Sequence, residues 1–346
     1  MPQSLSTRLH LEFLESRSVP AGNVMVNVNN GVLNVIGDNA GNRIQIVQPN
    51  PFSLIIRPGD TSTQINGHLS TITIITGGVS KINIDLRGGD DVLQISPGGG
   101  LVVFNAPVFI NTGTGNDSVL IEDIIAHNHF FIDTGNQNDT VLLQAPATTL
   151  QFDRNVTILT GQGFDILTIQ NTVIRGSLML TTAQQNDQVR ILSSVVGGDF
   201  FANLGDGSDM IILNQLEVRG QAFISGSAGS DFVQIARGQF DFSLRINTAQ
   251  PPGFFSADND TVTIGNTQVA GETTISTGRG ADFVRLRDFN FFNARVIVDL
   301  GEDNDSLEFA FNDFQLGMIA DGGLGADTFV DLGSNTGLVQ LERFFP

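Results

Sequence analysis

An aspartate recurs along this chain at intervals close to 22 residues. Each copy closes a Gly-rich or Asn-rich turn, and the successive intervals are 26, 22, 26, 22, 22, 22, 29, 22, 23 and 22 residues. A fixed period of about 20 to 50 residues is typical of a solenoid, in which each unit buries its apolar face only against its neighbours. The eleven aspartates are Asp91, Asp117, Asp139, Asp165, Asp187, Asp209, Asp231, Asp260, Asp282, Asp305 and Asp327.

The apolar residues around each aspartate predict short β-strands with one buried face. Apolar side chains stand two and four positions after the aspartate, as in Val119 and Ile121. A second pair stands nine and seven positions before it, as in Val108 and Ile110, and a single apolar residue stands thirteen positions before it, as in Ile174. We therefore expect three short strands per coil, separated by glycine-containing corners.

Stacked coils of this kind predict an all-β protein, a parallel β-helix (β-solenoid) of about 22-residue coils wound in the right-handed sense. Helices are disfavoured because β-branched residues, Gly and Asn dominate. We expect residues 1–22 to be an N-terminal export or processing segment and residues 23–346 to be one solenoid. Within it, 23–81 are expected to be irregular first coils with a cap, 82–333 the regular repeats, and 334–346 a C-terminal cap. In the first coils Asn42 takes the aspartate's place.

Composition narrows the range of partners. The formal net charge is −19, and the chain has 17 basic residues, of which Lys81 alone is a lysine, so no nucleic-acid partner is expected. Cations are the more natural partners. There is no cysteine, which excludes disulfides, and no stretch approaches the roughly 20 apolar residues that span a bilayer.

Coils in register would place the aspartates in a column, about 4.8 Å apart. Two carboxylates at that distance repel by about 3 to 4 kcal/mol at an effective dielectric constant of 20, so this repulsion must be offset. Two solutions remain open from the residues alone. Each aspartate accepts hydrogen bonds from the N–H groups of its own corner, as in an Asx-turn. Alternatively, calcium binds between successive corners through carboxylate and carbonyl oxygens.

The turns before the aspartates bear on this choice. "GGLGAD", at Gly322 to Asp327, is the GGxGxD motif, and "GTGND" and "GDGSD" match it in part. These turns resemble those of RTX proteins, whose β-rolls bind calcium between stacked GGxGxD turns. The nine-residue tandem period of that family is absent, and "TAQQND" before Asp187 has no glycine. The calcium ligands that the resemblance implies are Asp117, Asp139, Asp165, Asp209, Asp231, Asp282, Asp305 and Asp327.

The N-terminal run "LHLEFLESRSVPA" differs from the repeats. It resembles the "LExLExR…PA" element at the N-terminus of many large surface and secreted proteins of certain bacteria, matching from Leu11 to Ala21. That resemblance implies an exported protein, located outside the cell or on its surface.

Three further features are candidates for chemistry or binding. His127 and His129 alternate on one face of an extended segment, as either a transition-metal pair or an exposed corner. Arg285, Arg287 and Asp288 form the densest charged set, which is most simply a solvated face. The insertion "TAQPPGFFSADND" carries a Phe pair that would either dock a partner or cover a neighbouring coil.

These observations favour a non-catalytic, exported structural, surface or adhesive β-solenoid, with calcium ions and surface polysaccharide or other surface proteins as partners. The alternative is a polysaccharide-active or polysaccharide-binding β-helix protein, lyase-like or hydrolase-like. Whether the protein is an enzyme stays open, with the scattered glutamates favouring the non-catalytic interpretation because glycosidic chemistry needs clustered carboxylates.

Overall fold

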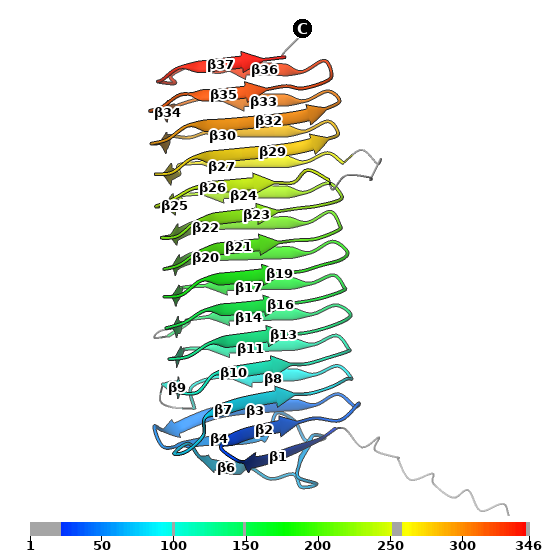
Figure 1. Ribbon diagram of the computed structural model, residues 1–346. Coiled ribbons are helices and arrows are strands. Elements are labelled where there is room, and N and C mark those ends of the chain that lie inside the picture. The colour runs from blue at the N-terminus through cyan, green and yellow to red at the C-terminus, as the bar shows by residue number, and fades with distance from the viewer. Residues whose placement is uncertain (1–21, 99–100, 148–149, 251–257, 344–346) are drawn as a thin grey trace, which may run out of the picture.

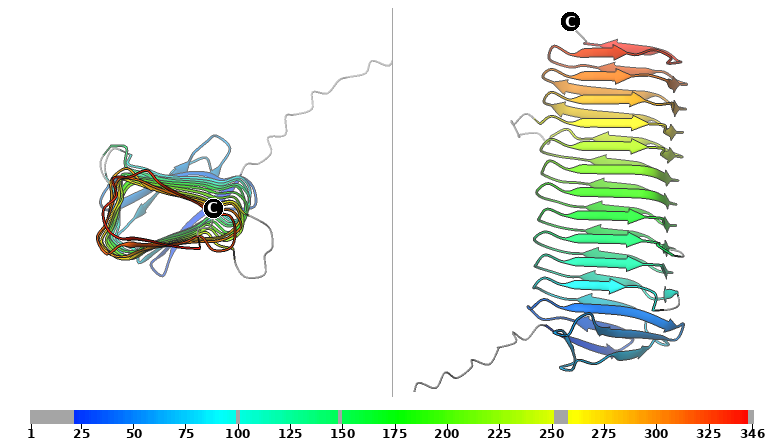
Figure 2. Two further views of the ribbon diagram at one scale, coloured as in Figure 1. Left: turned by 90° about the horizontal axis from the view of Figure 1, so that it is seen from above. Right: turned by 180° about the vertical axis from the view of Figure 1, so that it is seen from behind.

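The computed structural model describes residues 22–98, 101–147, 150–250 and 258–343. These residues contain no helix and form a parallel β-solenoid of about 11 turns, each of about 22 residues. The coils rise in one stack from an N-terminal base to the C-terminal end (Figure 1). Seen along the stack, they overlay in a single oblong outline (Figure 2). The fold class predicted from the repeat is therefore confirmed.

A regular coil contains the three expected strands. In one coil these are β17 (Ile166–Gln170), β18 (Thr172–Ile174) and β19 (Leu178–Thr181). The first two belong to one sheet and flank a bend at Asn171, whose φ of 51° is left-handed. The third lies in the opposite sheet. Each coil thus has three sides: two long strands on opposite faces of the core, and one short strand, here β18, that connects them.

Two long sheets make up the described part of the chain. The first has fifteen strands: β1 (Asn23–Asn29), β2 (Val32–Ile36), β5 (Gln64–Ile65), β7 (Lys81–Asp85), β10 (Val108–Asn111), β13 (Phe130–Asp133), β16 (Val156–Leu159), β19, β21 (Phe200–Asn203), β23 (Ala222–Ser225), β26 (Leu244–Asn247), β29 (Thr273–Arg279), β32 (Val296–Glu302), β35 (Met318–Asp321) and β37 (Val339–Glu342). The second has twenty-two: β3 (Arg43–Asn50), β4 (Ser53–Pro58), β6 (Ile72–Ile75), β8 (Val92–Ile95), β9 (Val102–Phe104), β11 (Ser118–Glu122), β12 (Ile124–Ala126), β14 (Thr140–Gln144), β15 (Leu150–Phe152), β17, β18, β20 (Gln188–Val196), β22 (Met210–Val218), β24 (Phe232–Ala236), β25 (Gln239–Phe240), β27 (Thr261–Gly265), β28 (Gln268–Val269), β30 (Phe283–Arg287), β31 (Asn290–Phe292), β33 (Ser306–Phe309), β34 (Asn312–Phe314) and β36 (Thr328–Asp331).

Parallel pairing joins equivalent positions of successive coils. Leu167 pairs with Val189, and Val189 with Ile211, and all three side chains are almost fully buried. The apolar positions expected on either side of the aspartates are likewise buried, including Val108 and Ile174. These side chains belong to one continuous hydrophobic core that runs along the stack. Burial of each one contributes about 1.5 to 3 kcal/mol to the free energy of unfolding.

The N-terminal base departs from the regular pattern. Strands β2 and β3 pair in parallel with β7 and β8 of the next coil, but β1 lies antiparallel to β2, and β4 and β6 extend the other sheet antiparallel. These antiparallel strands cover edges that would otherwise be exposed (Figure 1). At the other end, β37 pairs in parallel with β35, as an ordinary coil strand does.

Glycine is favoured where successive turns before the aspartates come into contact. Gly205 has a φ of +89°, and a Cβ there would lie 1.8 Å from the carbonyl oxygen of Ala183 in the previous coil. Ala183 itself occupies the equivalent position at a φ of 75°. We expect Gly205→Ala to lower the free energy of unfolding by about 1 to 3 kcal/mol, and Ala183→Gly to leave it unchanged or raise it by up to about 1 kcal/mol.

Urea unfolding followed by circular dichroism measures both changes. Equal destabilisation by the two substitutions would contradict the strained geometry of this turn.

Candidate functional site

The repeated aspartates form a column inside one corner of the solenoid. Their exposed fractions run from 0 to 4%, so all of them are buried. Each stands at the end of a turn, directly before a strand of the second sheet; Asp165, for example, precedes β17. The column begins with the buried Asn42, as the sequence predicts.

A hydrogen bond between coils holds each aspartate. Oδ1 of Asp187 accepts the backbone N–H of Asp165 at 2.8 Å, and Oδ1 of Asp209 accepts that of Asp187 at 2.7 Å. The same bond recurs at every step from Asn42 to Asp327, with distances between 2.6 and 2.9 Å. The backbone carbonyl of Asp165 meanwhile accepts the N–H of Gln188 in the next coil. The side chain therefore supplies the acceptor that the sheet lacks where its strands begin.

This geometry corrects the Asx-turn interpretation. The N–H that each Oδ1 accepts belongs to the aspartate of the preceding coil, not to the aspartate's own turn. A local Asx-turn would tie down one corner only. The observed bond ties two coils together and fixes their register.

The second carboxyl oxygen is the unusual feature. In the part of the chain that the structure describes, Oδ2 of each of the eleven aspartates is buried and accepts no hydrogen bond. Thr182 lies beside the carboxyl of Asp187, but its hydroxyl donates to the carbonyl of Leu204 at 2.6 Å. Because a hydroxyl has one hydrogen, Thr182 can offer Asp187 only a lone pair. A proton on Oδ2 would satisfy both groups.

Burial favours that proton. Loss of hydration raises the pKa of Asp187 to about 8, although the hydrogen bond from the N–H of Asp165 lowers it. Burial also raises the pKa of Asp117. The same cause raises the pKa values of other members of the column: about 6 for Asp165 and Asp282, about 7 for Asp209 and Asp305, about 8 for Asp91, Asp139 and Asp260, and about 9 for Asp231.

A second row of side chains runs along the outside of the same corner, one residue before the aspartates. Oδ1 of Asn116 accepts the N–H of Asn138, and Oδ1 of Asn138 accepts that of Phe164 at 2.9 Å. Here the acceptor belongs to the earlier coil and the donor to the later one, opposite to the aspartate column. The steps from Asn116 to Phe164 are thus bonded in both directions.

All eight predicted calcium ligands lie in this column. The structure brings them together as the sequence predicts, but as buried side chains with one oxygen bonded to a backbone N–H. Among the described residues, no three His, Asp or Glu side chains are grouped so as to hold a metal ion. Calcium binding by these residues stays a prediction.

The raised pKa values predict a pH dependence of stability. The folded values of about 6 to 9 exceed the value of about 3.9 expected for an unfolded aspartate, so the folded state binds more protons. The stabilisation is complete below about pH 4 and is lost as the pH rises through about 6 to 9. We expect the thermal unfolding midpoint to fall over that range, each aspartate contributing at most about 1.4 kcal/mol per pH unit.

Calorimetry across that pH range measures this dependence, and unfolding near pH 6 in a weak buffer should release protons. Uptake of protons, or stability that rises with pH, would contradict the protonated column.

Two substitutions of Asp187 distinguish the contribution of its hydrogen bond to stability from the contribution of its charge. Asp187→Asn keeps an acceptor for the N–H of Asp165 and cannot ionise, so we expect little change near pH 5 and greater stability than the unsubstituted protein near pH 9. Asp187→Ala leaves that N–H without its acceptor and should cost about 1 to 3 kcal/mol near pH 5, where the unsubstituted carboxyl is neutral.

Asp206→Asn is the matched control, because it removes a formal charge from an exposed position in the next coil. Denaturant unfolding of the three variants at both pH values measures the effects. An Asn variant as unstable as the Ala variant near pH 9 would rule out a neutral column.

The histidine pair lies at an exposed corner. Nδ1 of His127 is 2.5 Å from Oδ2 of Asp153, and Arg175 donates to Oδ1 of the same carboxylate at 2.9 Å. His129 is exposed. Asp153 thus bridges a histidine and an arginine from the neighbouring coils, which lie 26 and 22 positions away along the chain, the same spacing as the repeat.

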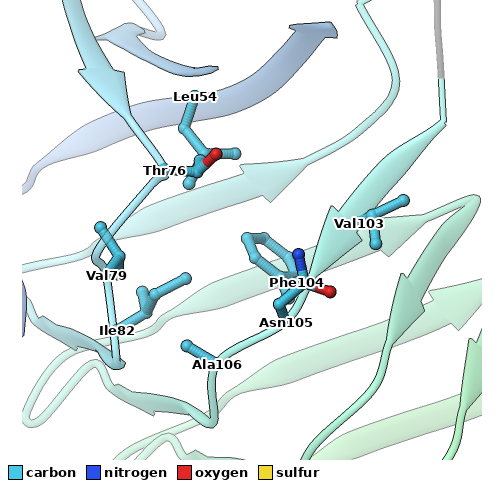
Figure 3. A pocket seen from close by; sticks show the side chains of 8 residues that line it. All are labelled: Leu54, Thr76, Val79, Ile82, Val103, Phe104, Asn105 and Ala106. Atoms are coloured by element: carbon cyan, nitrogen blue, oxygen red, sulfur yellow. The ribbon is translucent and has the colours of Figure 1, made fainter. Parts of the chain in front are cut away.

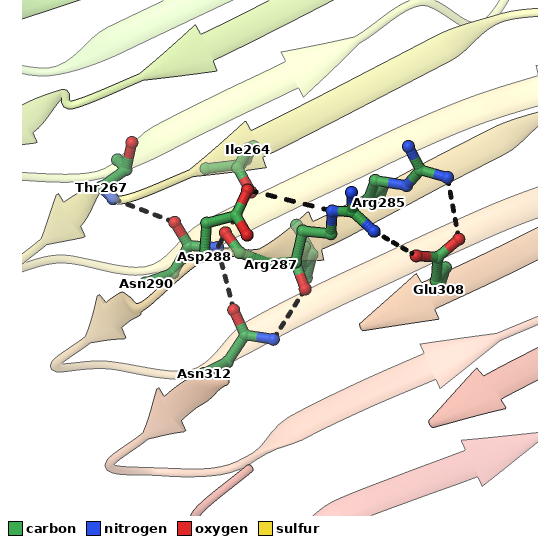
Figure 4. A network of polar contacts seen from close by, with 9 residues as sticks. Ile264, Thr267, Arg285, Arg287, Asp288, Asn290, Glu308 and Asn312 are labelled. Atoms are coloured by element: carbon green, nitrogen blue, oxygen red, sulfur yellow. Dashed lines mark hydrogen bonds and ion pairs between the residues drawn. The ribbon is translucent and has the colours of Figure 1, made fainter. Parts of the chain in front are cut away.

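The charged set around Arg285 is also ion-paired between coils. Arg285 and Arg287 donate to the two oxygens of Glu308 at 2.9 and 3.0 Å (Figure 4). Beside them, Asn290 accepts the N–H of Thr267 and donates to Asn312. The arginines therefore fix neighbouring coils to each other.

One crevice opens where the base meets the second coil. Leu54, Val79, Ile82 and Phe104 are among the side chains that line it (Figure 3). Its volume of about 20 Å³ has room for roughly one water molecule, far below the about 300 Å³ of the smallest common ligand pockets.

Two predictions fall outside the described residues. The export segment covers residues 1–22, of which only Gly22 is described, and the Phe pair of the long insertion is Phe254 and Phe255. No helix in the described ranges is long and apolar enough to cross a membrane.

No family model, no curated protein and no solved structure gives a significant match to the chain.

Proposed function

We propose that this protein is a non-catalytic structural rod, exported and displayed at a cell surface or in a matrix. The observation that carries the proposal is the uninterrupted bonding of aspartate side chains to the backbone of the preceding coil, from Asn42 to Asp327. A bond of this kind at every coil holds the stack in one register along its length. The β-solenoid fold fits a structural or surface role.

Polar side chains join coils at the other corners as well. At the corner before β19 and β21, Ser177 N–H donates to Asn155 Oδ1 and Asp199 N–H to the Ser177 hydroxyl, both at 3.1 Å. At the bend between the two strands of the second sheet, Asn312 accepts from Asn290 at 2.9 Å. Side-chain bonds that link coils at each corner support a stiff rod.

Glutamate, aspartate and histidine side chains that could serve in acid–base chemistry instead form contacts between coils. Glu308 holds Arg285 and Arg287, and Asp153 holds His127 and Arg175. The hydrogen bond with His127 and the nearby Arg175 lower the pKa of Asp153, which makes it a poor proton donor near neutral pH. This supports a structural rather than a catalytic role.

For the aspartate column we propose proton binding in place of calcium. Calcium prefers six to eight oxygen ligands. In the column one oxygen of each carboxyl accepts a backbone N–H and the other is buried, so the carboxylates would have to leave these positions to reach a hydrated ion. Export rests on the resemblance of the N-terminal "LExLExR…PA" run alone.

Thermal unfolding with and without millimolar calcium tests the assignment of the column. A ligand that binds only the folded state raises its midpoint by mass action, and we expect no rise here. Magnesium at the same concentration controls for general screening of the −19 net charge. A calcium-specific rise that Asp209→Asn abolishes would replace the proton column with a calcium column.

A separate assay decides between the rod and the polysaccharide-active alternative. Incubation with a panel of neutral and acidic polysaccharides, followed by measurement of new reducing ends and of unsaturated products, should show no turnover. Product formation above that of a heat-unfolded sample would overturn the structural assignment.

A further inference from the structure

An aromatic groove lies on the outer surface near the C-terminal coils, along β31 and β34. Phe289, Phe291 and Phe311 line it together with Asp313 and Thr336, and its volume is about 360 Å³. That is at the lower end of the range of about 300 to 1,000 Å³ for small-ligand sites. The groove therefore has the size to hold a side chain or a small organic group.

Packing does not account for these rings. Phe289 is 74% exposed and Phe311 is 44% exposed, and their ring centroids are 5.4 Å apart. The neighbouring Phe292 and Phe314 are fully buried and stack inside the core. The fold thus buries one pair of aromatic rings and leaves the other in solvent.

The backbone at both positions is unfavourable for phenylalanine. Phe289 and Phe311 have φ values of 68° and 55°, in the left-handed region that bulky side chains rarely adopt. Earlier coils have Asn171, Ser193, Gln215, Arg237 and Asn266 at this bend, and Asn in particular suits that conformation. Two successive coils therefore present aromatic rings to solvent where the earlier coils have polar side chains.

The charges around the groove are acidic. The Asp313 carboxylate accepts from the Thr336 hydroxyl at 2.6 Å, whereas the 69%-exposed Asp288, next to Phe289, is paired with Arg287 at 3.9 Å. The nearby Arg285 and Arg287 are directed to Glu308 (Figure 4). With a net charge of −19 on the whole chain, the groove attracts cations and repels anions.

We propose that the groove binds an arginine side chain from a basic segment of a partner protein. Aromatic faces attract cations, and a planar guanidinium stacks on them more readily than a lysine ammonium does. The guanidinium would lie against Phe289 and Phe311, with the Asp313 carboxylate as its counter-charge and Phe291 against the apolar stem. The proposal gives a partner class to the proposed surface role and is independent of the aspartate column.

Fluorescence anisotropy of a fluorescein-labelled Gly-Arg-Gly-Arg-Gly peptide tests it, at about 150 mM salt, where charges more than about 8 Å apart are largely screened. We expect saturable binding that weakens about tenfold in the Phe289→Asn/Phe311→Asn double variant. Asn suits the left-handed backbone, so the unfolding midpoint of that variant should not fall. Asp313→Asn should weaken binding as well.

Phe201→Thr is the matched control. It removes a 42%-exposed ring from another coil, next to Phe223, and Thr157 occupies the equivalent position two coils earlier. This variant should bind the peptide unchanged. Unaltered binding by the double variant would assign the attraction to overall charge and overturn the site.

Three other results would also overturn the proposal while leaving the structural rod intact. One is the absence of saturable binding. The others are equal binding of a peptide with citrulline, the neutral analogue of arginine, and displacement of the peptide by a neutral oligosaccharide.

Discussion

One hydrogen bond, from the backbone N–H of an aspartate to the side chain of the next aspartate in the column, sets the geometry on which the rest of the solenoid depends. It lies where the strands of the second sheet begin and backbone acceptors run out, so it continues the sheet's bonding into the corner. Its cost is the burial of a carboxyl group in every coil. A bound proton removes most of that cost, because a neutral acid loses far less hydration than an anion does.

Protonation lowers the electrostatic repulsion between neighbouring aspartates without a counter-ion. Eleven ionised carboxylates in a row would oppose stacking, and the outer surface already carries most of the other acidic residues. At pH 7 the five members whose pKa is about 8 or 9 are mostly neutral, which changes the formal charge from −19 to −19 + 5 = −14. The composition of this chain therefore overstates the charge of its folded form. At the first position, Asn42 contributes its backbone N–H to the column, and its side-chain oxygen accepts no hydrogen bond.

Much of the fold could be predicted from the sequence because the repeat places identical environments one above another. Alternation around Asp187 predicts the burial of Val189 and Ile191, and the period predicts that the aspartates align. The direction of the aspartate bond could not be predicted, since an Asx-turn and a bond between coils need the same residue at the same position. The antiparallel pairing of the base could not be predicted either, because its strands do not follow the 22-residue repeat. The aromatic groove gave only a faint signal: Phe311 stands where Asn171 and Asn266 stand in other coils.

The one-way order of the aspartate bonds also bears on how the chain acquires its structure during synthesis. The antiparallel base comes from the first described residues, so its strands can pair while later coils are still on the ribosome. Each completed coil then presents an aspartate N–H that only the side chain of the following coil can satisfy. Each of these bonds joins two coils that are synthesised one after the other and lie next to each other in the stack. The rod can therefore grow from its base one layer after another, each layer serving as the template for the next.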